Sequence, residues 1–311
     1  MMADAPLYRR LALIGIGLIG SSVARAAARA GLAGEIVCAD ASEAVRSKAL
    51  ELGIVSAAYA DPAEAVRDAD LVIVCTPLGT YPAIGQAIAG ALLPGATVSD
   101  VGSCKAVVFR DLGEHLPKTV HFIPGHPVAG TENSGPESGF AELFQNKWFI
   151  LTPGPDANAE ALERLKDFWA RTGSKVELMD PQHHDLVLAI TSHVPHLIAY
   201  NIVATADDLE TVTKSEVIKY SAGGFRDFTR IAASDPTMWR DVFLNNKEAV
   251  LEMLGRFNED LAALQRAIRW GDGDALFNLF TRTRAIRRQI IDAGQEVASP
   301  DFGRQIKPPA G

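Results

Sequence analysis

Apolar runs and helical patterns alternate along the first 180 residues. Short runs that are apolar throughout, such as LVIVC at 71–75, are typical of parallel strands buried on both faces. The pattern predicts strands at 11–15, 35–40, 71–76, 96–100, 120–124, 148–152 and 175–179, and helices at 19–30, 43–52, 62–68, 81–92, 105–115 and 158–172. This alternation predicts an α/β fold with a doubly wound sheet.

The pattern changes after Asp180-Pro181, and no convincing strand pattern occurs between 182 and 298. Residues 182–206 form an apolar helical stretch, in which Pro195 predicts a kink. Asp235-Pro236 predicts the start of another helix, and Gly271 the end of a long one. We therefore expect an all-helical C-terminal domain at 181–311, with a further helix at 273–293 and an irregular tail at 299–311.

Apolar residues on the long helix recur at alternate spacings of four and three: Val250, Leu254, Phe257, Leu261, Leu264 and Ile268. Such a seam either packs within the helical domain or joins two subunits. We favour a subunit interface, because an all-helical half needs a large partner to cover this face. The seam thus predicts a homodimer formed through the helical domain.

The apolar run 11–14 stops at a G-x-G-x-x-G made by Gly15, Gly17 and Gly20, and a helical pattern follows at once. These glycines permit a tight turn, close approach to a pyrophosphate, and close packing of helix on strand. Asp40 lies about 20 residues further on, where an acid binds the ribose hydroxyls of NAD. The combination predicts a Rossmann-type dinucleotide-binding domain over 1–180; the alternative is a glycine turn that binds nothing.

Composition narrows the function classes. The net charge of -8 and the lack of a basic block give no support to nucleic-acid binding. The N-terminal sequence lacks a secretory pattern, and no apolar run approaches the length of a membrane span. The three cysteines lie far apart without metal-ligand spacing, so we expect reduced thiols, a cytoplasmic location and no bound metal.

Several polar clusters follow predicted strands, at the sheet edge where α/β proteins bind ligands. Thr76-Pro77 is either a cofactor contact or a strand-ending turn. Ser103 can donate a hydrogen bond to a ligand or cap the helix that follows it. His126 lies between a glycine and a proline on a loop after a strand, and such a fixed imidazole suits proton transfer.

Two more clusters lie in the helical half. Ser192 and His196 share a helix face and point to a ligand pocket or to an internal network; a zinc pair of His193 and His196 lacks a third ligand. The pair His183-His184 at the domain join is expected to be exposed. In the loop after 222, Arg226 and Arg230 suggest a carboxylate clamp, or else a salt bridge to a neighbouring acid.

Three motifs together carry a family resemblance: GHPVAGTE at 125–132, SHxPH at 192–196 and GGFRDFTRIA at 223–232. With them the chain resembles the prephenate/arogenate (cyclohexadienyl) dehydrogenase family of tyrosine biosynthesis, from Leu11 to about Ile291. The resemblance implies oxidative decarboxylation of prephenate or arogenate, with a hydride passed to NAD. The runner-up is a β-hydroxyacid dehydrogenase, whose site usually relies on a lysine.

The resemblance also implies residue roles. His126 takes the proton of the ring hydroxyl, and Ser103 orients that hydroxyl. Arg230, with Arg226 as the alternative, binds a substrate carboxylate. Other substrate contacts fall at Ser192, His196, Thr131, Glu132, Gly223, Asp227 and Trp239. Cofactor contacts fall at Gly15, Gly17, Leu18, Ile19, Gly20, Asp40, Thr76 and Pro77.

Some choices stay open at this level. Asp40 should repel a 2′-phosphate and favour NAD over NADP, although Ser42 and Arg46 would suit a phosphate if Asp40 turned away. Prephenate and arogenate differ by one amino group, and no residue that reads it can be located. Any inhibition by tyrosine would act at or near the active site.

Overall fold

The computed structural model describes residues 5–213 and 219–292. The chain forms two compact units, one through Met253 and one from Leu254 onward. This division does not test the expected domain boundary at 180, which stays a prediction. The expected tail at 299–311 lies outside the described residues. The α/β part contains β1 (Tyr8–Ile14), α1 (Leu18–Arg29), β2 (Ala33–Ala39), α2 (Glu43–Glu51), β3 (Ala57–Tyr59), α3 (Pro62–Val66), β4 (Leu71–Val74), α4 (Tyr81–Ile88), β5 (Thr97–Asp100), α5 (Ala106–Asp111), β6 (His121–Phe122), β7 (Gly125–Pro127), β8 (Trp148–Leu151), α6 (Ala159–Arg171) and β9 (Lys175–Leu178).

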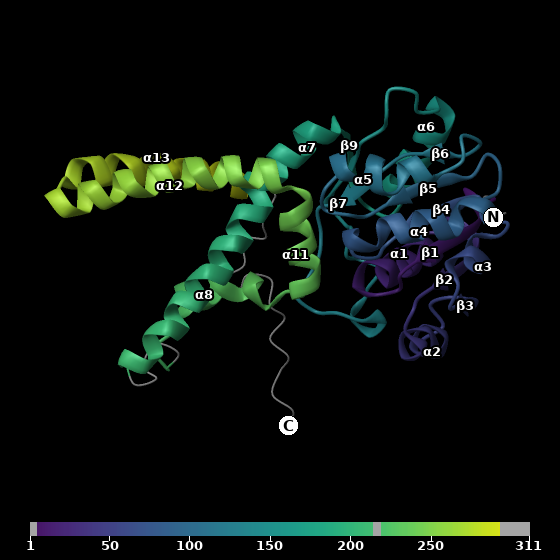
Figure 1. Cartoon of the computed structure of the whole chain (residues 1–311), viewed down its shortest axis with the longest axis horizontal. Coiled ribbons are helices and arrows are strands. Elements are labelled where there is room, and N and C mark those ends of the chain that lie inside the picture. Colours follow the sequence, from purple (N-terminus) through teal and green to yellow (C-terminus); the bar gives the residue numbers. More distant parts are fainter. Residues whose placement is uncertain (1–4, 214–218, 293–311) are drawn as a thin grey trace. The chain divides into compact units, whose positions relative to one another are not determined.

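A six-stranded parallel sheet has the order β3-β2-β1-β4-β5-β6. This is the strand order of dinucleotide-binding sheets. The chain adds strands outward in one direction from β1 to β3 and in the other from β4 to β6, so the topological switch point lies between β1 and β4. The predicted Rossmann-type fold is confirmed, with helices packed against the sheet (Figure 1). The short edge strand β3 was missed, because three residues, two of them alanine, are too few to give a strand pattern.

The two last predicted strands are real, but their place in the main sheet was wrong. β8 and β9 form a separate sheet with β7, in the order β7-β8-β9, and β7 runs antiparallel to β8. Only two residues separate β6 from β7, too few for the crossover that a parallel neighbour needs. The segment that carries His126 is therefore a short strand and not the loop we expected.

Apolar side chains fill both faces of the main sheet. On one face α1 and α6 cover β1 and β2, and the ring of Trp169 stacks on Phe149 from β8 at 3.7 Å between centroids. On the other face lie α3 and α4. A third cluster joins Val74, Tyr81 and Val108 to Trp239 and Val242 of α11 (Pro236–Asn245), so α11 is anchored at the carboxyl edge of the sheet.

The helical part begins with α7 (Pro181–Leu188), a π-helical turn at Ala189–His193, and α8 (Val194–Thr213). The irregularity expected at Pro195 thus takes the form of a π turn directly before it, a common cause of helix bending. The remaining elements are α10 (Gly223–Thr229), a 3₁₀ turn at Arg230–Ala233, α11, α12 (Lys247–Trp270) and α13 (Gly273–Asp292).

The helical run Pro181–Asp208 is long and apolar enough, by length and composition, to cross a membrane. The expectation that no run approaches this length was therefore wrong. A single such helix is weak evidence for a span, since core helices meet the same criterion. Here the run carries His184, Asp185 and His193, which are all buried inside the protein.

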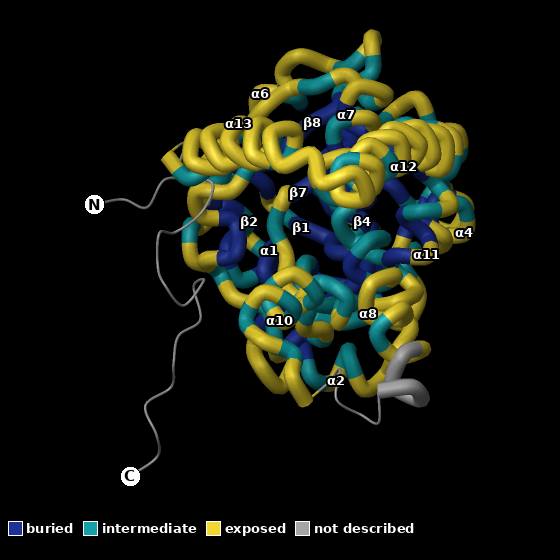
Figure 2. Tube along the Cα trace, turned by 90° about the vertical axis from the view of Figure 1, so that its left-hand side faces the viewer, coloured by how far each residue is buried: buried dark blue, intermediate teal, exposed yellow. Residues whose placement is uncertain are grey.

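Helices α12 and α13 keep large apolar side chains on their surface. Leu261 is 43% exposed, Ile268 67% and Phe277 69%. Figure 2 shows these helices mostly exposed, while the strands of the main sheet are buried. The predicted seam lies on one continuous helix, on which Leu261 and Ile268 are exposed, Val250 is buried, and the other three seam residues are partly buried.

Candidate active site

The glycine-rich turn has the geometry that the motif requires. Gly15 has a positive φ of 93°, and a side chain there would collide with Thr76 and Cys75. A Cβ on Gly20 would lie 2.2 Å from the Gly15 carbonyl oxygen, so helix and strand approach too closely for any other residue. Gly17 begins α1 without a side-chain cap and has open space above it. The turn can therefore receive a phosphate at the helix N-terminus.

Asp40 follows β2 at the same edge of the sheet. Its carboxylate accepts the Ile16 N–H at 3.1 Å and the Ser42 N–H at 3.0 Å, so it is tied to the glycine-rich turn. Arg46 donates to the backbone carbonyls of Asp40 and Ala41. This leaves the acid, and not the arginine, in the place where a ribose would bind.

Two cavities lie beyond the carboxyl ends of the strands. The first, of about 300 Å³, is lined by Gly17, Leu18, Ile19, Thr76 and Pro77, which are predicted cofactor residues. The second, of about 510 Å³, is lined by Ser192, His196, Arg230 and Trp239, which are predicted substrate residues. Both are also lined by Ser103, His126, Thr131 and Glu132. The cavities thus meet at the candidate catalytic pair.

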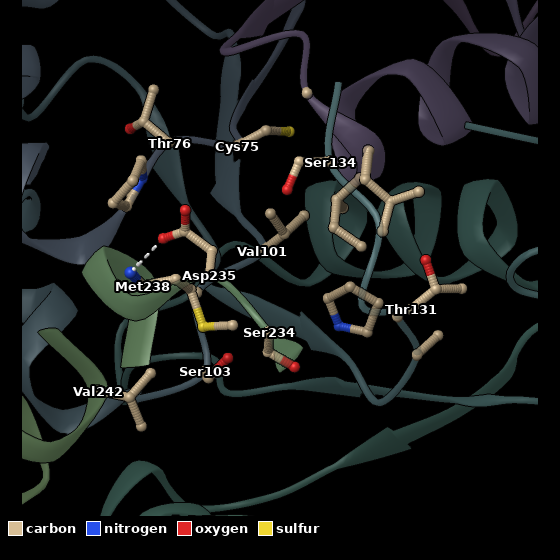
Figure 3. Close-up of a pocket in the computed structure, with 18 of the residues that line it drawn as sticks. Cys75, Thr76, Val101, Ser103, Thr131, Ser134, Ser234, Asp235, Met238 and Val242 are labelled. Atoms are coloured by element: carbon tan, nitrogen blue, oxygen red, sulfur yellow. Dashed lines mark hydrogen bonds between the residues drawn. The ribbon is translucent and has the colours of Figure 1, made fainter. Parts of the chain in front are cut away.

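The shared wall is built from distant segments. Figure 3 shows Ser103, Thr131, Ser234 and Met238 around the first cavity. Asp235 caps α11 by accepting the Met238 N–H at 2.8 Å, which confirms the predicted helix start. Ser103 does not cap α5, whose N-cap position is Lys105, so its alternative structural role is not realised.

Strand β7 is held in place by a buried ion pair. Lys105 and Asp100 have fully buried side chains, with Nζ 2.5 Å from Oδ2. Lys105 also donates to the Gly125 carbonyl at 2.7 Å, and the Gly125 N–H donates to Asp100 at 3.1 Å. Asp100 further accepts the hydroxyl of Tyr81. Both backbone polar groups of the residue before His126 are therefore fixed by one buried pair.

The expectation that both neighbouring histidines are exposed was wrong for His184. Its side chain is fully buried, and its Nε2 lies 2.9 Å from Nδ1 of His126. Its own Nδ1 lies 2.8 Å from Asp185 Oδ1. The local signal for this burial is an acid beside a histidine within an otherwise apolar helical run.

Asp185 joins α7 to the sheet edge. Its carboxylate accepts the N–H groups of Lys105 at 2.7 Å and Ala106 at 2.9 Å, at the start of α5. Asn246 donates to the Asp185 carbonyl and lies 3.0 Å from Nδ1 of His193. These contacts place the first turns of the helical half directly against the segment that carries Ser103.

His193 of the π turn and His196 of α8 lie in different surroundings. His193 is buried beside Asn246, while His196 stacks on the Trp239 ring at 3.7 Å and bonds the Ser192 carbonyl. The described residues contain no group of three His, Cys, Asp or Glu placed to bind a metal ion. His196 and Trp239 instead form an aromatic wall of the second cavity.

Arg230 faces Glu132 across the mouth of the second cavity. Its Nη1 lies 3.0 Å from Glu132 Oε2, and the arginine side chain is 50% exposed. Arg226, Gly223 and Asp227, all on α10, line neither cavity. The structure thus brings Arg230 and His126 to one cavity and leaves Arg226 outside it.

Burial controls the charge of the site histidines. It lowers the pKa of His126 well below its usual 6.5, and repulsion from His184 and Lys105 adds to this. Burial also lowers the pKa of His184, although its hydrogen bond to Asp185 opposes that shift. The pKa of His193 falls to about 4, again chiefly through burial. His126 is therefore a neutral ring able to accept a proton at neutral pH.

Comparisons with known proteins agree along the chain. Residues 23–178 match the nucleotide-binding domain of prephenate dehydrogenase, and residues 180–282 match its dimerization domain. The cyclohexadienyl dehydrogenase of Zymomonas mobilis is 41% identical over 281 residues, covering 90% of this chain and 96% of the relative. The prephenate dehydrogenase of Bacillus subtilis is 33% identical over 291 residues, or 93% and 78%.

A solved structure is also similar over nearly its full length. Prephenate dehydrogenase from Aquifex aeolicus, in complex with hydroxyphenyl propionate and NAD+, has a TM-score of 0.84 and 35% identity. The match covers 91% of this chain and 98% of that one.

Proposed function

This chain belongs to the prephenate dehydrogenase family, and from that membership we propose that it oxidatively decarboxylates prephenate, arogenate or both in tyrosine biosynthesis. The products would be 4-hydroxyphenylpyruvate from prephenate and tyrosine from arogenate. The observation that carries the assignment is that His126 and Ser103 line both cavities, while Arg230 lines the second. One ligand can thus meet a base, a hydroxyl donor and a guanidinium.

The chain's residues fit NAD as the cofactor. The open space above Gly17, the uncapped start of α1 and the acid at Asp40 suit a pyrophosphate and an adenosine ribose. When bound, NAD+ accepts the hydride. We further propose a preference for NAD over NADP, because the Asp40 carboxylate would repel a 2′-phosphate and Arg46 is engaged with backbone carbonyls.

His126 acts as the general base in this scheme. Its Nδ1 is engaged by His184, so Nε2 is the ring nitrogen that accepts the proton of the substrate hydroxyl. Ser103 orients that hydroxyl from the loop after β5. As the hydride leaves the ring carbon, the O–H electron pair forms the carbonyl. The ring carboxylate then departs as CO₂, the electron pair of the broken C–C bond makes the ring aromatic, and the former carbonyl oxygen takes the proton back from His126 to become the phenol hydroxyl. Aromatisation favours this loss, so the protein's tasks are binding, orientation and proton removal.

Arg230 binds a substrate carboxylate. A guanidinium holds a carboxylate bidentately, and both proposed substrates carry two carboxylates. The present partner, Glu132, forms an exposed pair that contributes at most about 1 kcal/mol, so a substrate carboxylate can replace it at small cost. Ser192, His196, Thr131 and Trp239 complete the wall around the ring in this proposal; Gly223 and Asp227 would act only indirectly.

The assembly we propose is a homodimer. Residues 180–282 match a dimerization domain, and the apolar seam of α12 leaves Leu261 and Ile268 exposed in the single chain. A light-scattering mass of one chain at micromolar concentration would contradict this.

A cytoplasmic location is supported by the three free cysteines. Inhibition by tyrosine at the active site stays a proposal that a competition assay can test.

The function is tested with purified protein, NAD and each of the two substrates. Prephenate or arogenate should give reduced cofactor and the matching aromatic product. His126→Asn should lower kcat by about 10²–10⁴-fold, the usual range for a lost general base, and leave NAD binding nearly unchanged. Retention of full kcat in this variant would remove the base from the scheme.

A further inference from the structure

We propose that His184 and Asp185 form a buried relay with His126 that holds its ring in the tautomer with Nδ1 protonated and Nε2 free to accept a proton. His184 is then a positioning residue, since it contacts the base and not the substrate. The inference rests on the proposed function, because it assigns a task to His126 as base. Its geometric part can nevertheless be tested without substrate.

The donor and acceptor nitrogens of the two histidines can be assigned from backbone N–H groups, which can only donate. The N–H groups of Lys105 and Ala106 can only donate, so the Asp185 carboxylate acts as their acceptor. Asp185 Oδ1 therefore also accepts from Nδ1 of His184, at 2.8 Å. A neutral imidazole has one donor and one acceptor nitrogen. Nε2 of His184 is thus the acceptor, and Nδ1 of His126 must donate to it across 2.9 Å.

Burial makes this arrangement stringent. His184 is fully buried, Asp185 is 5% exposed and His126 is 7% exposed. An imidazole nitrogen without a partner in such surroundings costs about 1–3 kcal/mol, which favours this tautomer over the other. The charged or titratable groups that also face the relay are Lys105 with its partner Asp100, His193 from the π turn, and the buried thiol of Cys104.

The relay can also move the positive charge that His126 acquires when it accepts a proton. When Nε2 of His126 takes the substrate proton, the ring becomes an imidazolium whose Nδ1–H already points at His184. A shift of that Nδ1 proton to Nε2 of His184 leaves His126 neutral and places the positive charge beside the Asp185 carboxylate. One proton enters at one end and one moves at the other, with no further reactant needed. In the Ser-His-Asp triad a buried carboxylate likewise holds a catalytic imidazole in one tautomer and stabilises its charged form, there by direct contact and without proton transfer to the carboxylate.

The first experiment uses the unaltered protein. Nitrogen-15 NMR of histidine-labelled protein at pH 7.5 reports which ring nitrogen carries hydrogen, and His126→Asn identifies the His126 signals. We expect Nδ1–H and a bare Nε2 on His126, and Nδ1–H on His184. A His126 ring with its hydrogen on Nε2 would overturn the relay whether or not the protein turns over either substrate.

The second experiment compares two amides at position 184. His184→Gln can place its carbonyl oxygen where Nε2 lay and accept from His126, but it loses the bond to Asp185. His184→Asn can keep a donor to Asp185 but does not reach His126. We expect kcat to fall at least about 100-fold in the asparagine variant and much less in the glutamine variant, with KM for substrate nearly equal in both.

A merely structural role predicts a different result. Both variants remove one buried hydrogen bond, so their unfolding midpoints should lie close together, and their kcat values should then follow stability alone. Equal kcat values, or a more active asparagine variant, would contradict the relay. If neither variant folds, the NMR result on the unaltered protein decides. If the unaltered protein has the expected tautomer but turns over neither prephenate nor arogenate, the proposed function would be rejected instead.

Discussion

Replacing Lys105 by methionine tests whether the ion pair behind β7 holds the site together. Lys105 is fully buried and donates to both Asp100 and Gly125. Methionine has a similar length and fills the space, but it carries no charge and donates no hydrogen bond. The Asp100 carboxylate would then stay buried without its cation, although Tyr81 and two backbone N–H groups still donate to it.

The size of the effect follows from that burial. Removing one member of a buried pair leaves an uncompensated charge and typically costs about 3–5 kcal/mol. The same exchange at an exposed pair should cost about 0–1 kcal/mol. Lys166 on α6 offers the matched control: its Nζ lies 2.7 Å from Glu163, but the two side chains are 32% and 67% exposed. The difference between the losses of unfolding free energy in the two variants measures the effect of burial.

The assay is urea unfolding of both variants beside the unaltered protein, followed by circular dichroism. Lys105→Met should unfold at a clearly lower urea concentration with a similar slope, and Lys166→Met should stay close to the parent. Because the pair also fixes Gly125 beside His126, kcat should fall in Lys105→Met under conditions where it is folded. A cost below about 1 kcal/mol, or equal costs at both sites, would refute the reasoning from burial.

Three further outcomes are expected. Arg230→Gln should raise KM for substrate with little change in KM for NAD, whereas Arg226→Gln should change neither; steady-state kinetics decides, and a reversed pattern would move the clamp to Arg226. Asp40→Ser should improve NADP use relative to NAD by about tenfold or more, which corresponds to about 1.4 kcal/mol of lost repulsion and is read from the two kcat/KM values. Neutral His193 contributes stability that is present above pH 6.5 and is lost as the pH falls toward about 4, since the unfolded chain binds the proton first. The loss is up to about 3 kcal/mol for this group, so His193→Asn, which can still accept from Asn246, should flatten the acid side of the unfolding curve.

Much of the fold could be predicted because its signals are local. The glycines at 15, 17 and 20, the apolar strand runs and the Asp-Pro helix starts each act through their own neighbours in the chain. The motifs around His126, Ser192 and Arg230 likewise pointed to one family before any contact was known. These features depend on backbone conformation and periodicity, which short stretches of sequence largely determine.

The partner of the base was decided only by tertiary packing. His183 and His184 are adjacent and chemically identical, yet one is exposed and the other is fully buried against His126, 58 positions away along the chain. Neighbouring helical residues point about 100° apart, so the way α7 docks on the sheet edge selects between them. The separate β7-β8-β9 sheet and the Lys105–Asp100 pair arise in the same way. Their cause is the free energy of contacts between distant segments, which no local pattern encodes.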